Sequence, residues 1–253
     1  MAKIPELVAH RGAQIKYPEN TLESLDAAFK AGACFVEFDV QITADSIPVL
    51  FHDTDLHRIT GVNGNILELT LRQVKELNAG EKERLGDQFS HVQIPTLAET
   101  VALLQKWPSR HGFLEIKIES LKSLGIHKVV KTILQFIEPI LGQLTIISED
   151  LLVLSHVRAL GAKSIGWVMA EWNNDARSQA AKLVPNYLIC NHQKIPPQIT
   201  QLWPGPWKWM LYDVVDPQLA RVLATWGAAF IETFDIENML KDSALNHKAC
   251  FEH

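Results

Sequence analysis

The chain has 253 residues, of which 47% are hydrophobic, so a single domain can bury a large apolar core. Its 24 Lys and Arg residues are outnumbered by 29 Asp and Glu residues, which gives a formal charge of -5. This balance excludes the basic surface field on which nucleic-acid binding depends, and predicts a small-molecule ligand instead.

The hydrophobic residues are dispersed in short blocks. Charges interrupt each apolar run before it could span a bilayer, and the N-terminal residues lack the apolar stretch of a signal peptide. The three cysteines, Cys34, Cys190 and Cys250, are odd in number and widely spaced, which is typical of reduced thiols rather than a disulfide framework. We therefore expect a cytoplasmic protein without membrane insertion, and leave open whether it is a homodimer.

Eight short apolar runs, rich in β-branched residues, alternate with helical segments. They cover residues 7–9, 34–42, 113–118, 144–147, 164–169, 187–190, 209–215 and 228–234. Such alternation predicts parallel βα units in one α/β domain spanning residues 1–253. A closed TIM (β/α)8 barrel is the most economical fold for this length, and an open doubly wound sheet is the alternative.

Two local features follow in chain order. Asn20 is the predicted N-cap of the first helix, and Gly32 its stop signal. Residues 47–51 follow the second strand across a short turn, and residues 53–95 then contain no clear barrel strand. Four glycines interrupt this region, which predicts a small inserted subdomain after the second strand, lying over one face of the barrel.

Charged residues stand at the ends of several predicted strands, where the active site of a TIM barrel lies. Glu37 and Asp39 are two positions apart, so both carboxylates point to one face of their strand. Glu115 is similarly placed on the next barrel strand. Like charges inside a barrel are costly without a cation, and carboxylate oxygens favour Mg²⁺ or Ca²⁺. The competing explanation is a solvated strand face.

Two histidines and a lysine complete this constellation. His10 and His52 each end an apolar run, and their imidazoles can carry acid–base chemistry near neutral pH. Lys117 shares a strand face with Glu115 and can contact a phosphate oxygen. Structural histidines and an interior ion pair between Glu115 and Lys117 are the alternatives.

These residues fall in an ordered series of motifs. The series is HRG at residues 10–12, PENT at 18–21, EFDV at 37–40, PVLFHD at 48–53, IPTL at 94–97 and EIK at 115–117. It resembles the signature of the glycerophosphodiester phosphodiesterase family, over nearly the whole chain. The resemblance implies a TIM barrel with an inserted subdomain that hydrolyses glycerophosphodiesters to sn-glycerol 3-phosphate and an alcohol.

The resemblance also implies roles for the site residues. The divalent cation, Mg²⁺ or Ca²⁺, would be held by Glu37, Asp39 and Glu115. The acid–base pair would be His10 and His52, and the phosphate would be bound by Arg11 and Lys117.

The second half of the chain departs from the family pattern. Glu149, Tyr212 and Glu232 stand where such enzymes often have aromatic or apolar residues, so the pocket for the alcohol is less certain than the chemistry. A lysophospholipase D, with an apolar surface supplied by the insertion or by the tryptophans near residue 205, is one alternative. A catalytically silent binding barrel is the other.

Overall fold

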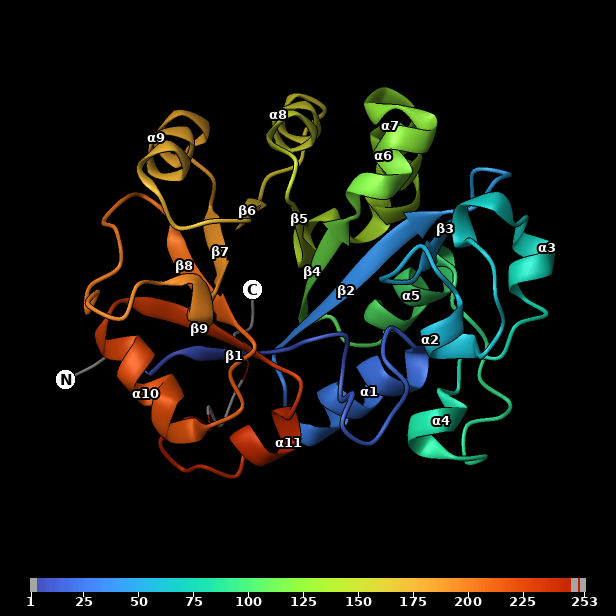
Figure 1. Ribbon diagram of the computed structural model, residues 1–253, viewed down its shortest axis with the longest axis horizontal. Helices are drawn as coiled ribbons and strands as arrows, with labels where there is room; N and C mark the ends of the chain where they lie inside the picture. The colour runs from blue at the N-terminus through green and yellow to red at the C-terminus, as the bar shows by residue number, and fades with distance from the viewer. Residues whose placement is uncertain (1–3, 247–249, 251–253) are drawn as a thin grey trace.

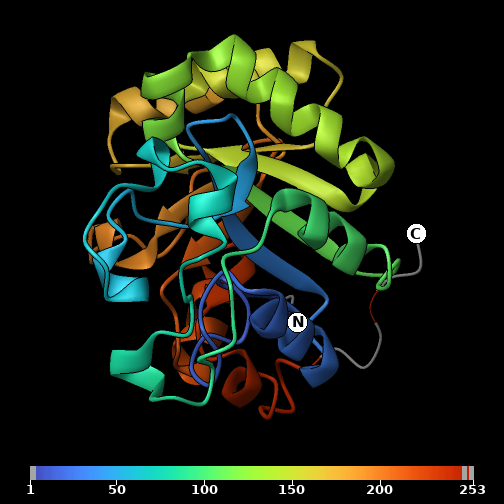
Figure 2. The same ribbon diagram turned by 90° about the vertical axis from the view of Figure 1, so that its right-hand side faces the viewer.

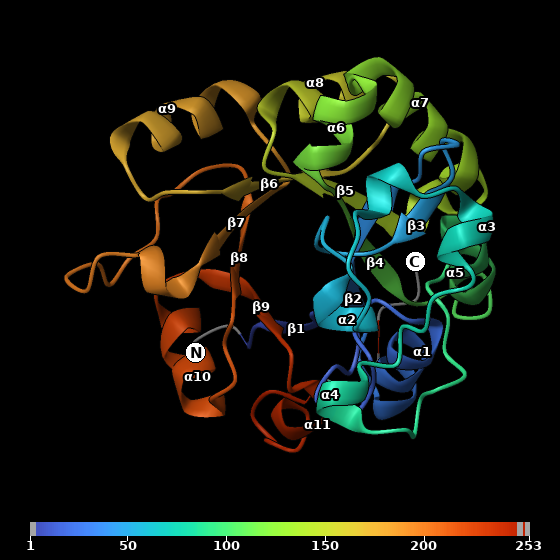
Figure 3. The same ribbon diagram turned by 45° about the vertical axis from the view of Figure 1, so that its right-hand side comes forward.

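The computed structural model describes residues 4–246 and residue 250. Within them, eight parallel strands close into a barrel, because β1 pairs with both β2 and β9 (Figures 1 and 3). In order around the ring the strands are β1 (Glu6–Ala9), β2 (Phe35–Ile42), β4 (His111–Ile116), β5 (Leu144–Ser148), β6 (Ile165–Met169), β7 (Tyr187–Asn191), β8 (Lys208–Tyr212) and β9 (Ala228–Thr233). The predicted TIM barrel is confirmed.

The interior of the barrel is filled with side chains. A buried apolar cluster contains one or two residues from seven of the strands: Val8, Phe113, Ile147, Val168, Tyr187, Ile189, Met210 and Phe230. The alternate residues of the same strands face outward and pack against the surrounding helices. This packed layer is the floor beneath the polar end of the barrel.

Helices surround the barrel in the described part of the chain. They are α1 (Leu22–Ala31), α5 (Leu97–Leu104), α6 (Ile118–Leu124), α7 (Ile126–Ile137), α8 (Leu151–Ala159), α9 (Asn174–Leu183), α10 (Pro217–Thr225) and the short α11 (Ile236–Met239), with a 3-10 segment η2 (Glu138–Gln143) after α7. Gly32 ends α1 at φ 107°, as expected. The predicted N-cap is wrong by one residue: Thr21 accepts the backbone N–H of Ser24, while Asn20 is engaged elsewhere.

The connection between β7 and β8 differs from those between the other consecutive barrel strands, because it contains no α-helix but only a 3-10 turn, η3 (His192–Lys194), and a long loop. Three tryptophan rings pack there against the outside of the barrel. The ring centroid of Trp172 lies 4.0 Å from that of Trp203 and 5.3 Å from that of Trp209. These tryptophans serve as packing where a helix would otherwise cover the strands.

The region between β3 (Pro48–Leu50) and α5 lies at one side of the barrel (Figure 2). β3 pairs antiparallel with β2, and the chain then forms α2 (His57–Thr60), η1 (Ile66–Glu68), α3 (Leu71–Val74) and α4 (Lys82–Leu85). These elements share a hydrophobic cluster of their own, which includes Phe51, Ile59, Ile66, Val74, Phe89 and Ile94. The assignment of residues 1–253 to one domain stays a prediction.

The expectation of reduced thiols is wrong for two of the three cysteines. Cys34, at the start of β2, forms a disulfide with Cys250, with a Cα–Cα distance of 5.3 Å; Cys190 is free and buried. The two partners are 216 residues apart in sequence, and only closure of the barrel brings the C-terminal segment beside β2. The cytoplasmic location therefore loses the support of the cysteine pattern.

None of the helices in the described part of the chain has the length and apolar character needed to cross a bilayer.

We expect the disulfide to be measurable in the purified protein. A non-reducing peptide map should contain a cross-linked peptide with Cys34 and Cys250. Reduction should lower the free energy of unfolding by about 2–4 kcal/mol, because the cross-link restricts the unfolded chain. Urea titrations with and without reductant measure this, and reductant should have no further effect on Cys250→Ser. Alkylation of all three cysteines in unreduced protein would contradict the assignment.

Candidate active site

A cavity opens at the carboxyl ends of the barrel strands, above the apolar floor. The lining residues lie on strands β4 to β9 or in the segments that follow β1, β3, β4, β5 and β8. They are His10, Arg11, His52, Glu115, Lys117, Ile147, Glu149, Val168, Ile189, Tyr212, Asp213 and Glu232. Five of the seven residues predicted from the sequence meet in this lining. The other two, Glu37 and Asp39, are buried on β2, and Asp39 is the register partner of Glu115.

Glu37, Asp39 and Glu115 come together as a carboxylate group. One oxygen from each lies within 4.8 Å of the others. The pleat of β2 puts Glu37 and Asp39 on the same inner face, and the parallel register with β4 puts Glu115 beside Asp39. Across a cation with metal–oxygen distances of about 2.0–2.6 Å, two ligand oxygens are at most about 5 Å apart. The spacing of these oxygens therefore fits such an ion.

Asp39 is the carboxylate with the most partners. Its oxygens lie 3.1 Å from Nε of Arg11 and 3.5 Å from Nζ of Lys117. Asn20 donates its side-chain N–H to Oδ2 of Asp39 at 2.8 Å and accepts the Asp39 backbone N–H at 3.0 Å. Burial alone would raise the pKa of Asp39, but the two cations and the Asn20 hydrogen bond hold that pKa well below its usual range.

Glu37 is in the opposite situation. Its side chain is 98% buried, and its Oε2 accepts the backbone N–H of Arg11 at 3.2 Å. Its Oε1 is buried and has no hydrogen-bond partner among the described residues. Burial, and then the charges of Asp39 and Glu232, raise the pKa of Glu37 well above its usual value. An orphaned buried carboxylate oxygen beside two further carboxylates is what a bound divalent cation would satisfy.

Glu115 shares its cation with Asp39, because Nζ of Lys117 lies 3.0 Å from Oε1 of Glu115. Burial and then the charge of Asp39 raise the pKa of Glu115, although Lys117 opposes them. The same carboxylates raise the pKa of Lys117 against the effect of burial, so its ammonium stays charged. The predicted interior ion pair is present, and it borders the cavity rather than replacing the site.

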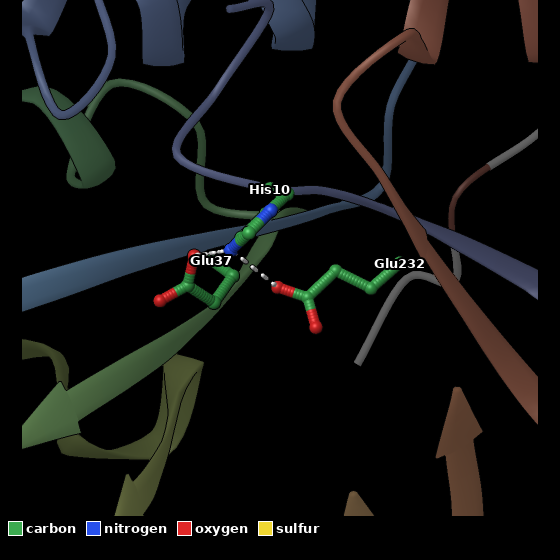
Figure 4. A group of neighbouring side chains, drawn as sticks. All are labelled: His10, Glu37 and Glu232. Carbon is green, nitrogen blue, oxygen red and sulfur yellow. Dashed lines mark ion pairs between the residues drawn. The ribbon is translucent and has the colours of Figure 1, made fainter. Parts of the chain in front are cut away.

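His10 lies between two carboxylates (Figure 4). Its Nε2 is 3.8 Å from Oε2 of Glu37 and 3.8 Å from Oε1 of Glu232. Burial, and then the charge of Arg11, lower the pKa of His10 to about 3. At neutral pH its imidazole is therefore neutral and has a lone pair available.

Glu232 is the residue whose place in the site was not foreseen. The sequence pattern marked it only as a departure on the alcohol side, yet its side chain is 96% buried and points toward His10 and Glu37 (Figure 4). Register places it beside Val8 of β1. The available signal was a single carboxylate inside the otherwise uncharged last strand, residues 228–233, because a parallel barrel strand buries both of its faces.

His52 has a carboxylate partner next to it in sequence. Its Nδ1 lies 2.5 Å from Oδ1 of Asp53, and the other oxygen of Asp53 accepts Nε–H of Arg58 at 2.6 Å. The hydrogen bond from His52, and after it that from Arg58, hold the pKa of Asp53 well below its usual range. Asp53 is thus a fixed anion that orients the imidazole of His52.

The remaining lining residues form the far side of the cavity. Glu149, Tyr212 and Asp213 line it, and Asp213 accepts a hydrogen bond from Asn191 at 2.7 Å. No tryptophan is among the described residues that line the cavity, so the aromatic cluster is not part of this pocket.

The fold and the cavity together define the class: a TIM barrel whose polar end can hold a divalent cation beside an anionic ligand. The model of the glycerophosphoryl diester phosphodiesterase family matches residues 10–202. The chain belongs to this family.

Individual relatives align over part of their length. Glycerophosphodiester phosphodiesterase 1 of Bos taurus is 45% identical over 95 residues, which are 38% of this chain and 29% of the bovine protein. A glycerophosphodiester phosphodiesterase of Caldanaerobacter subterraneus is 39% identical over 98 residues, or 39% of this chain and 40% of that protein. The chain thus matches less than half the length of either relative.

Solved structures match over nearly the whole chain. A phosphodiesterase of Oleispira antarctica, in complex with the product sn-glycerol-3-phosphate, superposes with a TM-score of 0.83 at 25% identity, covering 94% of this chain and 96% of that one. A glycerophosphodiester phosphodiesterase of Parabacteroides distasonis gives 0.78 at 20% identity, covering 95% and 97%, which supports the fold alone.

The raised pKa of Glu37 leads to a prediction about metal binding. A carboxyl group must lose its proton to ligate a cation, so Mg²⁺ or Ca²⁺ binding should release protons. The affinity should therefore strengthen as the pH rises from about 5.5 to about 8. Calorimetric titrations in buffers of different ionisation enthalpy measure both effects, with Glu37→Gln as the comparison. Equal affinity at both pH values would contradict the prediction.

Proposed function

We propose that the protein is a metal-dependent glycerophosphodiester phosphodiesterase, which hydrolyses glycerophosphodiesters to sn-glycerol 3-phosphate and an alcohol. The observation that carries the proposal is a cavity lined by two histidines, two cationic side chains and Glu115, with the carboxylates of Glu37 and Asp39 buried beside Glu115. Membership of the glycerophosphoryl diester phosphodiesterase family supports it, as does the structural similarity to an enzyme that was crystallised with its product, sn-glycerol-3-phosphate.

In this proposal Glu37, Asp39 and Glu115 would hold Mg²⁺ or Ca²⁺. When bound, such a cation would supply Lewis acidity and neutralise negative charge on the phosphodiester. The unsatisfied oxygen of Glu37 and the all-oxygen donor set favour a hard cation over zinc.

Arg11 and Lys117 would bind the phosphate. Both line the cavity, and both are anchored by Asp39, so their charges are already in place before a substrate arrives. Charge-assisted hydrogen bonds from such fixed donors stabilise an oxyanion without reorganisation. Because the backbone N–H of Arg11 already donates to Glu37, its guanidinium would be the part that binds the phosphate.

His10 and His52 would serve as the acid–base pair. One imidazole would take the proton from the attacking hydroxyl, and the other would give a proton to the oxygen of the leaving alcohol. The attacking group is either water or the substrate's own glycerol hydroxyl, in which case a cyclic phosphate forms first. Both imidazoles line the same cavity as Arg11 and Lys117, so each is within reach of a phosphate bound there.

The first test is release of the headgroup alcohol from glycerophosphocholine, glycerophosphoethanolamine and a lysophospholipid, where the other product is sn-glycerol 3-phosphate for the first two and an acylglycerol 3-phosphate for the third. We expect turnover of the first two, its loss with EDTA, and its return with Mg²⁺ or Ca²⁺. Glu37→Ala should be inactive because one ligand is missing, whereas Glu76→Ala, at an exposed position of the insertion, should match the wild type. Activity that survives chelation would overturn metal dependence, and turnover of the lysophospholipid alone would favour a lysophospholipase D.

The second test concerns the histidines. His10→Ala and His52→Ala should each lower kcat by about 10²-fold or more, because proton transfer is lost while the carboxylates and cations remain. Steady-state kinetics give kcat, and calorimetry with Mg²⁺ shows whether cation binding persists. A variant with near-normal kcat would remove its histidine from the mechanism.

A further inference from the structure

Arg58 lies in α2 of the insertion, and its guanidinium bridges two carboxylates from different parts of the chain. Its Nε donates to Oδ2 of Asp53 at 2.6 Å. Its two terminal nitrogens donate to the two oxygens of Glu19 at 2.9 Å and 2.8 Å. This is the planar, forked geometry that arginine can provide and lysine cannot.

On one side, the bridge reaches the proposed acid–base machinery. Asp53 uses Oδ2 for Arg58 and Oδ1 for Nδ1 of His52, at 2.5 Å. The side chain of His52 is 31% exposed and lies at the rim, where an imidazole without fixed partners would rotate freely. Because Arg58 fixes the carboxylate of Asp53, that carboxylate can in turn fix the orientation of the His52 ring.

On the other side, the bridge reaches the proposed phosphate-binding arginine. Glu19 is 94% buried and also accepts NH1 of Arg11 at 2.9 Å, while Nε of Arg11 lies 3.1 Å from Asp39. The result is an unbroken series of alternating charges that runs from a proposed metal ligand to a proposed acid–base residue: Asp39, Arg11, Glu19, Arg58, Asp53 and His52.

The middle members of this series do not border the cavity. Among its described lining residues are Arg11 and His52, but not Glu19, Arg58 or Asp53. A contact between Arg58 and the substrate therefore does not account for the arrangement. What Arg58 can do is fix the orientation of the two groups at the ends of the series.

We propose that Arg58 is a positioning residue, through which the insertion holds His52 and Arg11 in their working orientations at the same time. The proposal rests on the phosphodiesterase function proposed above. It gives the insertion a part in catalysis, because the guanidinium that completes the network comes from α2 and not from the barrel.

The insertion also offers a matched control. Arg84, in α4, is exposed to a similar degree, 39% against 46% for Arg58, and it also ties the insertion to the loop after β1. It donates to Glu81 and to the backbone carbonyls of Gln14, Ile15 and Tyr17. Through Glu81, whose Oε1 accepts the backbone N–H of Glu19 at 2.6 Å, these contacts reach the backbone of Glu19. None of them involves the carboxylates of Glu19 and Asp53 or the ring of His52. Loss of Arg84 therefore loosens the insertion without removing the bridge.

The experiment compares wild type, Arg58→Ala, Arg58→Lys and Arg84→Ala in the release of sn-glycerol 3-phosphate from glycerophosphocholine. We expect kcat of Arg58→Ala to fall about 10–100-fold, and Arg58→Lys to remain well below wild type because an ammonium cannot make the fork. Guanidinium chloride at about 50 mM, far below denaturing concentrations, should restore part of kcat in Arg58→Ala. Arg84→Ala should lose less than about a factor of three and gain nothing from guanidinium. Sodium chloride at the same concentration controls for ionic strength.

A second readout does not depend on turnover. In nuclear magnetic resonance spectra, the Nδ1 proton of His52 should be protected from exchange in the wild type, exchange rapidly in Arg58→Ala, and regain protection with guanidinium. An unchanged His52 signal in folded Arg58→Ala would overturn the proposal, as would kcat within about twofold of wild type or equal losses in Arg84→Ala. A wild-type protein that releases no glycerol 3-phosphate overturns the proposed function instead, and the His52 signal then still decides whether Arg58 positions the ring.

Discussion

The burial of like charges at one end of the barrel is the constraint on which the rest of the site depends. Glu37, Asp39 and Glu232 are almost completely enclosed, and Glu115 stands beside them. Carboxylates in such a place either take up protons or acquire cations, since the apolar floor beneath them offers no solvation. The structure shows both solutions in part: Asp39 is neutralised by two cationic side chains, whereas the pKa of Glu37 is raised.

The two cationic side chains are thus shared unequally among the buried carboxylates. Arg11 forms an ion pair with Asp39, and Lys117 forms one with Glu115. Glu37 and Glu232, which lie next to His10, have no comparable ion pair with either cation. A barrel core would be more stable with apolar residues at these positions. Clusters of buried charges with shifted pKa values are typical of sites that bind ligands or carry chemistry.

The insertion adds one further cation, Arg58, to the charged residues at this end of the barrel. Its hydrophobic cluster gives α2 a rigid base, so that the arginine it presents can reach both Glu19 and Asp53. Glu149, Tyr212 and Asp213 also line the cavity, and they do not belong to the series of alternating charges that contains Arg58. In TIM barrels generally, the loops at the carboxyl ends of the strands carry specificity while the strands carry the fold.

The sequence by itself predicted the barrel, because the alternation of apolar runs with helical segments is visible in the local sequence without any knowledge of tertiary contacts. It also supplied seven candidate site residues. Six of them, His10, Glu37, Asp39, His52, Glu115 and Lys117, are charged or titratable residues in or at the ends of apolar runs, and Arg11 came from the family resemblance. Which roles these residues play stays a prediction. The structure adds that five of them line one cavity, while Glu37 and Asp39 are buried beside Glu115.

Only the tertiary structure decided the features that join distant segments. Glu232 reaches His10 because the last strand pairs with the first, and Cys250 reaches Cys34 because the chain returns to the start of β2. Arg58 bridges Glu19 and Asp53 because the insertion folds back over the loop after β1. None of these distances follows from local propensity or spacing. They are set by the tertiary fold: the pairing of the last strand with the first brings Glu232 to His10, and the packing of the insertion against the loop after β1 brings Arg58 to Glu19.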